Sequence, residues 1–286
     1  MGLIIPAGPD WGFCTHNLPA TVDATAPGVA CTPGTSNSDG TAVDLFGSAL
    51  SHDVEYLKLA FNYTAGSGGN NDLLATILID PAGGTSWATL IPFLICGGIG
   101  RPLVSGSTPG GVFSSGYDFP LWIPAGATLG VQARSAHSSA GALTVTAIAH
   151  GGNASPASWW CGQRVTAIGV TEASSTGTAH TSGDSSAFST WTNLGSTLGA
   201  DCGALQWGVN GEGDTFGTNL SYYFEFGVSS VRIGSPIVKF ITSNEAGGTS
   251  ITGPIFKSLA SGTQLMVRGA CSGTAQALGV AAYAVH

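Results

Sequence analysis

Apolar and polar residues alternate along several stretches of the chain, which is the pattern of β-strands with one buried face. In the first half the apolar positions are Leu57, Leu59 and Phe61, followed by Leu73, Ala75, Ile77 and Ile79. In the second half they are Leu205, Trp207 and Val209, followed by Leu220, Tyr222, Phe224 and Phe226. Each run therefore predicts a strand that turns one side toward an apolar core.

The two halves carry these patterns in the same order, about 148 positions apart. The strand predicted at the end of each half matches most closely. Ala142, Leu143, Val145, Ala147 and Ala149 recur as Ala277, Leu278, Val280, Ala282 and Ala284, with identical residues at each position. A repeat of this kind predicts a tandem duplication of one structural module.

Glycine and proline leave little room for helices, since the 286 residues include 44 Gly and 14 Pro. Many short strands joined by turns are typical of a sandwich or jelly roll. We therefore predict an all-β protein of two tandem, duplicated β-sandwich modules of the jelly-roll kind. The boundary falls near the Gly-Gly-Asn-Ala-Ser segment at 151–155, so the modules span residues 1–152 and 153–286.

The first module is about 11 residues longer than the second between Cys96 and Pro124. The composition of this stretch predicts an extra loop near residues 97–120, which is either a tolerated insertion or a contact loop. The six cysteines are irregularly spaced, with no C-x-x-C pair. Buried small side chains account for them most simply, with disulfides or zinc ligation as the alternatives.

Charge is unusually scarce, at 8% of residues against a typical share of roughly 25%. A chain with so little charge is expected to cover much of its surface in an assembly. The net charge of −8 and the absence of a basic tract argue against nucleic-acid binding. No apolar run is long enough for a membrane span, and the N-terminal residues do not resemble a secretory signal. We expect a protein made in the cytoplasm without a signal peptide.

Motifs for catalysis and cofactor binding are absent from the sequence. It contains no G-x-S-x-G elbow, no phosphate loop and no H-E-x-x-H motif, so we predict no enzyme activity, no cofactor and no metal. Asp53 and Asp201 occupy matching positions before a strand, which predicts a role in a turn. Glu55 and Glu225 lie opposite the apolar face of their strands, so we expect them in solvent or in a subunit contact.

Aromatic residues are the best candidates for surface recognition, since such side chains on sandwich loops can stack on sugar rings. They would equally plug the ends of a sandwich or form subunit contacts. The candidates are four tryptophans, together with one basic residue in the predicted extra loop: Trp11, Trp122, Trp159, Trp160 and Arg101.

The chain resembles virion structural proteins of tailed bacteriophages. The resemblance is carried by the low charge, the strands rich in Gly, Ser, Thr and Ala, and the segment Phe119–Arg134. That segment contains an Ile-Pro-Ala-Gly-x-x-Leu lead-in to a strand, similar to the closing part of jelly-roll modules in tail, fibre and decoration proteins. The resemblance implies a capsid decoration, head or tail-fibre component located in the virion.

Three functions follow as hypotheses. The first is a non-enzymatic virion protein that assembles with itself, as a cyclic homo-oligomer such as a trimer, and with other virion proteins. The second is a carbohydrate-binding adhesin that recognises host-surface glycan. The third, least favoured, is a glycan hydrolase or lyase built on two jelly rolls, which requires a pair of carboxylates that spacing alone does not identify.

Overall fold

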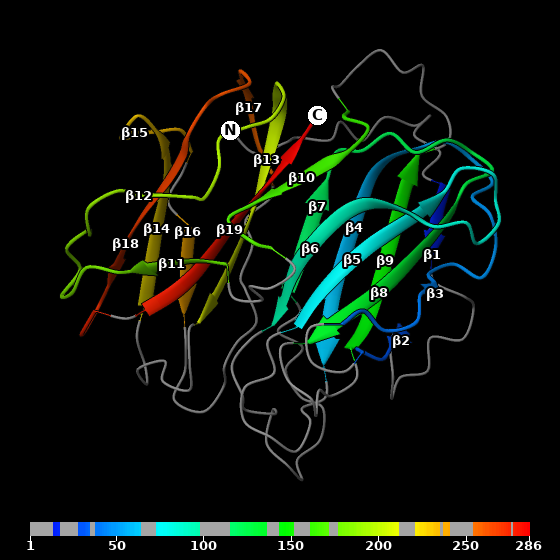
Figure 1. The fold of residues 1–286 in the computed structure, drawn as a ribbon, viewed down its shortest axis with the longest axis horizontal. Coiled ribbons are helices and arrows are strands. Elements are labelled where there is room, and N and C mark those ends of the chain that lie inside the picture. The colour runs from blue at the N-terminus through cyan, green and yellow to red at the C-terminus, as the bar shows by residue number, and fades with distance from the viewer. Residues whose placement is uncertain are drawn as a thin grey trace, which may run out of the picture.

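The computed structural model consists of strands and turns. It describes residues 14–17, 28–34, 38–63, 73–97, 115–135, 143–151, 161–171, 177–211, 221–234, 237–240, 254–275 and 277–286. No helix occurs in these ranges, and all the paired strands are antiparallel, which confirms the all-β prediction. The two halves of the chain lie side by side (Figure 1).

The first half forms two facing sheets. One has the order β1-β9-β4-β7, with β2 also paired to β9. The other has the order β3-β8-β5-β6. Because the last strand, β9, lies between the first strand and β4, the chain is wound as a jelly roll. The strands are β1 (Cys14–Asn17), β2 (Val29–Cys31), β3 (Val43–Asp44), β4 (Val54–Tyr63), β5 (Leu73–Asp80), β6 (Ala88–Gly97), β7 (Ser115–Phe119), β8 (Thr128–Ser135) and β9 (Leu143–Gly151).

The second half has the same pairing order. One sheet runs β10-β19-β13-β17 with β11 on β19, and the other runs β12-β18-β14-β15 with β16 on β14. Descent of the two halves from one duplicated module stays a prediction. The strands are β10 (Val165–Ile168), β11 (Thr178–Thr181), β12 (Thr192–Asn193), β13 (Cys202–Gly211), β14 (Ser221–Val228), β15 (Val231–Arg232), β16 (Ile237–Phe240), β17 (Ile255–Leu259), β18 (Leu265–Cys271) and β19 (Ala277–Val285).

The residues expected to face the core pack there where the structure describes them, with Ile79 only partly buried; Leu220 and the side chain of Tyr222 lie outside the described part of the chain. Leu57, Leu59 and Phe61 on β4 are at most 1% exposed. In the second half Trp207 on β13 is 1% exposed and stacks on Phe226, with 3.5 Å between ring centroids. These contacts join the two sheets of each half across an apolar interior.

The predicted turn aspartates also behave as expected. Asp53 Oδ1 accepts the backbone N–H of Ala125 at 2.7 Å, and Asp201 Oδ1 accepts that of Ser261 at 2.7 Å. Each carboxylate therefore ties the start of one strand to the turn before another, β8 in the first half and β18 in the second.

The prediction of one buried face per strand is wrong for β5, β13 and β19. On β5 the outward residues Leu74, Thr76 and Leu78 are buried as well. On β19, alternate residues belong to two different cores, because Leu278 and Val280 face the second half while Tyr283 and Val285 join the core of the first. The physical reason on β13 and β19 is that the first half covers their outer face.

Tyrosine hydroxyls hold the junction between the halves. Tyr283 Oη on β19 donates to the carbonyl of Phe93 and accepts the N–H of Ile95, both at 2.9 Å. Tyr117 Oη on β7 donates to the carbonyl of Ile95 at 2.6 Å, and its ring meets that of Tyr283 edge to face. Consequently β6 and β7 of the first half lie against β10 and β13 of the second (Figure 1).

The extra loop and the module boundary predicted from the sequence are described only in part. The end of the extra loop predicted near residues 97–120 is strand β7, because Tyr117 and Phe119 alternate into the core; residues 98–114 lie outside the described residues. The module boundary at 152–153 also falls outside the described residues and stays a prediction. The thiols of Cys31, Cys96, Cys202 and Cys271 are buried, as the simplest interpretation of the cysteines expects.

Candidate functional site

Four of the five surface residues proposed from the sequence lie outside the described residues: Trp11, Arg101, Trp159 and Trp160. Trp122 is described and is 38% exposed. Its backbone N–H donates to the carbonyl of Gly162 at 2.8 Å, in a short bridge between the two halves. Whether the Trp122 side chain recognises a ligand, plugs the end of a sandwich or forms a subunit contact stays a prediction.

A group of charged and aromatic side chains lies on the outer face of the β12-β18-β14-β15 sheet. Glu225 on β14 is directly opposite Arg268 on β18. Its carboxylate accepts Arg268 Nε at 2.7 Å and Nη2 at 2.5 Å, and it accepts Arg232 Nη1 at 3.1 Å. Two guanidinium groups therefore share one carboxylate. Together with the aromatic residues described next, we call this the Arg268 cluster: Phe188, Trp191, Glu225, Arg232 and Arg268.

Two aromatic rings clamp the Arg268 guanidinium. Its Cζ lies 4.8 Å from the ring centroid of Phe188 and 4.7 Å from that of Trp191, within cation–π range. The Trp191 ring in turn lies on the backbone of Gly227, where an added Cβ would approach the ring to 2.8 Å. The absence of a side chain at Gly227 thus lets Trp191 lie close to the sheet.

A buried histidine fixes the loop that carries Phe188 and Trp191. His180 Nδ1 lies 3.0 Å from Thr192 Oγ1, and Nε2 lies 3.2 Å from Ser189 Oγ, which also accepts the N–H of Gly269 at 3.1 Å. Burial lowers the pKa of His180 to about 4, so the ring is neutral near pH 7. A neutral imidazole accepts at one nitrogen and donates at the other, which suits these two hydroxyl partners.

The Ser189 and His180 pair resembles the nucleophile and base of a hydrolase only in distance. His180 is 3% exposed, and both of its ring nitrogens already have a hydroxyl partner. The backbone N–H of Ser189 already donates to the carbonyl of Gly269 at 2.8 Å and is not available to stabilise an oxyanion. The arrangement therefore positions the loop.

The sequence did not identify the Arg268 cluster. Glu225 lies on the outward side of its strand, as expected. Of its two predicted surroundings, solvent is wrong because two arginines cover Glu225 to 5% exposure, and a subunit contact stays a prediction. The outward positions of Glu225 and Arg268 can be read from alternation. Their pairing depends on the register between β14 and β18, which alternation does not specify.

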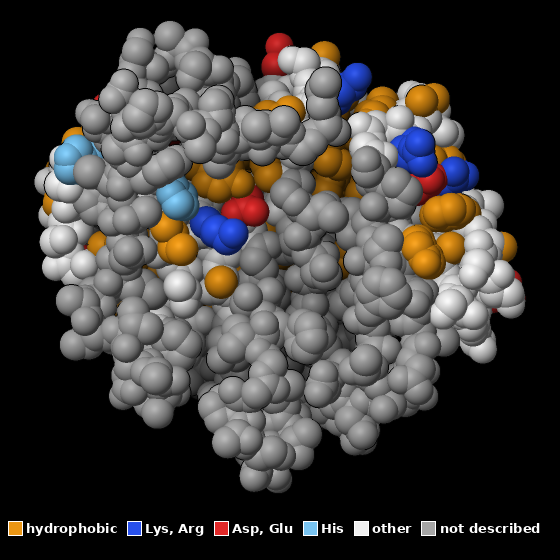
Figure 2. All heavy atoms as spheres, turned by 180° about the vertical axis from the view of Figure 1, so that it is seen from behind, with side chains coloured by type: hydrophobic (Ala, Val, Ile, Leu, Met, Phe, Trp, Pro, Cys, Tyr) orange, Lys and Arg blue, Asp and Glu red, His pale blue; other side chains and the backbone are white. Residues whose placement is uncertain are grey.

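A second group lies on the outer face of the first half. Lys58 on β4 is opposite Asp118 on β7, and His150 on β9 meets the ring of Tyr56 edge to face. Burial, followed by the nearby charge of Lys58, lowers the pKa of His150. Figure 2 shows one face of the molecule, on which the charged side chains that are described form small mixed groups between hydrophobic and uncharged surface.

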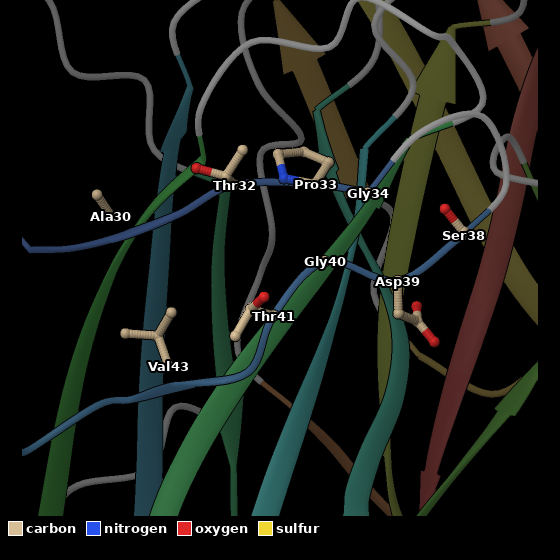
Figure 3. Close-up of a pocket in the computed structure, with 9 residues that line it drawn as sticks. All are labelled: Ala30, Thr32, Pro33, Gly34, Ser38, Asp39, Gly40, Thr41 and Val43. Carbon is tan, nitrogen blue, oxygen red and sulfur yellow. The ribbon is translucent and has the colours of Figure 1, made fainter.

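A pocket of about 550 Å³ lies beside β2 and β3. Its lining comes from segments 30–34 and 38–43, which run side by side and carry short side chains (Figure 3). Asp39 is the charged residue of the lining, and Arg134 neutralises it through two hydrogen bonds of 2.9 and 2.8 Å. The pocket thus offers hydroxyl groups without an aromatic platform, which makes it a weaker candidate than the Arg268 cluster.

Within the described ranges, no three His, Cys, Asp or Glu side chains lie close enough together to hold a metal ion. In those ranges the structure also has no helix long and apolar enough to cross a membrane.

Comparisons with known proteins give remote structural likeness. No protein-family model matches the chain, and no curated protein matches it. Among solved structures, PNGF-II has 9% sequence identity and a TM-score of 0.39; the alignment covers 96% of this chain, which spans 65% of the length of PNGF-II. The STIV MCP, a viral capsid protein, has 10% identity and a TM-score of 0.33, with 90% of this chain and 96% of that chain covered.

A third solved structure is the CBM22-1-CBM22-2 tandem domain of Paenibacillus barcinonensis Xyn10C. It has 10% identity and a TM-score of 0.24, with 88% of this chain and 85% of that chain covered. The similar structures thus include a viral capsid protein and a tandem carbohydrate-binding module. Structural likeness at these TM-scores shows nothing about the activity of this chain.

Proposed function

We propose that this chain is a non-enzymatic structural protein of a virus particle, a capsid decoration, head or tail-fibre component of a tailed bacteriophage. It assembles with copies of itself and with other virion proteins through the surfaces of its sandwiches. The observation that carries the proposal is the joining of two jelly rolls into one body by a buried apolar contact, beneath a surface that has very little charge.

The buried junction supports a mechanical role. Tyr283 and Val285 on β19 are 0% exposed against the first half, and the Tyr283 hydroxyl bonds two backbone groups of β6. Buried apolar area contributes about 25 cal/mol per Å², and the hydroxyl contacts add direction to it. Two halves held in this way keep a fixed relative position, as a subunit of a particle requires.

Exposed apolar side chains support self-assembly. In the described part of the chain the large ones are Trp122, Phe188, Val231 and Phe256. Val231 is 67% exposed on β15 and Phe256 is 44% exposed on β17, and each of these strands ends the hydrogen-bonded order of its sheet. A sheet edge with apolar side chains is a surface on which another chain can pair. The low charge of the whole chain, 8%, fits burial of such surface.

The proposal is tested by the mass of the full chain in solution. Light scattering across a hundredfold range of concentration should give a defined oligomer, as expected for closed symmetry. Phe256→Asp should shift the protein toward monomer, because it places a charge in the apolar contact. Ser48→Asp, which adds the same charge at an exposed position of the first half, should leave the mass unchanged.

A particle test completes the experiment. Antibodies against the purified chain should label the surface of virus particles that contain it in negative-stain images. The proposal would be overturned if the wild-type chain stayed monomeric at every concentration and the antibodies labelled no particle.

A further inference from the structure

The Arg268 cluster carries a local excess of positive charge on an acidic protein. Arg232 and Arg268 together bring two positive charges to the single negative charge of Glu225, whereas the whole chain has a net charge of −8. Only eight residues of the chain are Lys or Arg, so two beside one carboxylate is a concentration of them. The surplus of one positive charge attracts a ligand with one negative charge.

Arg232 has donors to offer such a ligand. Its side chain is 53% exposed, and its contact with Glu225 uses one nitrogen, Nη1, at 3.1 Å. A guanidinium carries five N–H donors in a planar fork that matches the two oxygens of a carboxylate. Arg268 has fewer donors left for a ligand, since two of its nitrogens donate to Glu225 and its guanidinium contacts two aromatic rings. Arg232 is therefore the ligand-binding arginine and Arg268 the supporting one.

Phe188 adds an apolar surface beside Arg268, which shares the Glu225 carboxylate with Arg232. Its ring lies 4.8 Å from the Cζ of Arg268, yet the residue is 39% exposed. An exposed aromatic ring beside a cation suits a molecule that has both an apolar face and an anionic group. A pyranose ring with a carboxylate combines these features, because the C–H groups on one side of the sugar stack on an aromatic ring.

The site is held in place before any ligand binds. Ser189, next to Phe188 in the chain, is bonded both to His180 and to the backbone of Gly269. Trp191 is fixed between the guanidinium of Arg268 and the backbone of Gly227. A site whose loop is already ordered loses little conformational entropy on binding, which favours even a small ligand.

From these observations we propose that the Arg268 cluster binds a carboxylated sugar, such as a sialic or uronic acid unit of a glycan. The carboxylate pairs with the Arg232 guanidinium, and the sugar ring stacks on Phe188. The single surplus charge argues against a nucleic acid, which requires several clustered basic residues, and the exposed Phe188 ring favours an anion carried on a sugar over a free anion. Glycan recognition of this kind goes beyond the proposed structural role and does not depend on it.

Binding is tested on the full chain by ligand-observed NMR with 3′-sialyllactose and digalacturonate. Lactose serves as the neutral sugar, and N-acetylglutamate as a dicarboxylate without a sugar ring, matched in charge to digalacturonate. We expect at least one acidic sugar to bind. Lactose should bind about tenfold more weakly, the size of one charge-assisted hydrogen bond, and N-acetylglutamate several-fold more weakly because it has no ring to stack on Phe188. Binding should also weaken as salt is added, because the attraction is partly Coulombic.

Variants locate the site. Arg232→Gln should weaken acidic-sugar binding by about tenfold or more, and Phe188→Ala should weaken it several-fold. Lys257→Gln, which removes an exposed positive charge from β17, is the matched control and should bind as the wild type does. Since Arg232 lies on an exposed hairpin and Glu225 keeps Arg268 as its partner, Arg232→Gln should fold normally, as thermal unfolding will show.

The results that overturn the proposal are specific. They are no binding of either acidic sugar by the wild type, equal binding by Arg232→Gln and Lys257→Gln, or N-acetylglutamate binding as tightly as the sugars. Light scattering of the same samples separates this outcome from the structural proposal. If the chain still forms a defined oligomer but binds no acidic sugar, the proposed sugar site is wrong and the structural proposal stands.

Discussion

His180 shows how the surroundings of a single side chain determine its chemistry. The ring is 3% exposed and lies between the hydroxyls of Thr192 and Ser189. A protonated imidazole in that place would lose hydration without gaining a negatively charged partner, so burial lowers the pKa to about 4. Protonation of this one residue should therefore be linked to the stability of the fold.

We predict that His180 makes the protein less stable in acid. Between pH 6.5 and about 4 the unfolded chain binds a proton at this residue and the folded chain does not, so the free energy of unfolding falls as the pH is lowered through this range. The loss from this residue should reach roughly 3 kcal/mol at pH 4. Urea unfolding of the wild type and of His180→Gln at several pH values measures it.

The His180→Gln variant is compared by its pH dependence, since its stability at pH 7 can change for other reasons. It should lose less stability than the wild type between pH 7 and pH 4. Equal losses in the two proteins would mean that protonation of His180 is not linked to folding.

Single residues were predicted from the sequence where a local rule applies. Trp207 was correctly assigned to the core, and Asp53 and Asp201 to turns, because alternation and position before a strand are both local signals. Of the two alternatives predicted for Glu225, exposure to solvent is wrong because Arg268, 43 positions away in the chain, covers it together with Arg232. Contacts between residues so far apart depend on strand register.

At the scale of elements, alternation located the strands but understated the burial of some of them. Residues 277–285 form a continuous small and apolar run, Ala-Leu-Gly-Val-Ala-Ala-Tyr-Ala-Val. The last six of these residues are 0% exposed, Leu278 is 1% exposed, and Gly279 is buried as well. Such a run is typical of a strand covered on both faces. That signal was present in the sequence, whereas the identity of the covering element was not.

The matching turns before β8 and β18 give a prediction about elements. Asp201→Ala removes the acceptor for the N–H of Ser261, and Asp53→Ala removes the acceptor for that of Ala125. Each should lower the free energy of unfolding by about 1 kcal/mol, since both sites are exposed and water replaces the lost bond. Chemical denaturation measures the change.

Asparagine is the matched control for these turns, because its side-chain carbonyl can still accept the same N–H. Asp201→Asn and Asp53→Asn should retain most of the wild-type stability. If asparagine costs as much as alanine at both positions, the charge of the aspartate and not its hydrogen bond stabilises the turn.

At the scale of the whole molecule, the junction of the halves is the feature that sequence patterns did not predict. It brings Phe93 and Ile95 on β6 to Tyr283 on β19, nearly two hundred positions away. Repeated patterns indicate that two similar units are present. How the two units pack depends on the residues in which they differ. Tyr283 on β19, for example, stands where the first half has Ile148 on β9.

The junction predicts that the two halves unfold together. Calorimetry of the full chain should show one transition, and Tyr283→Phe should lower the free energy of unfolding by about 1–3 kcal/mol, because it leaves the N–H of Ile95 buried without its acceptor. Tyr223→Phe, on β14 in the other sheet of the second half, is the control and should have a smaller effect. Two separate transitions in the wild type, with Tyr283→Phe affecting neither, would show that the halves are independent and that the rigid body on which the structural proposal depends does not exist.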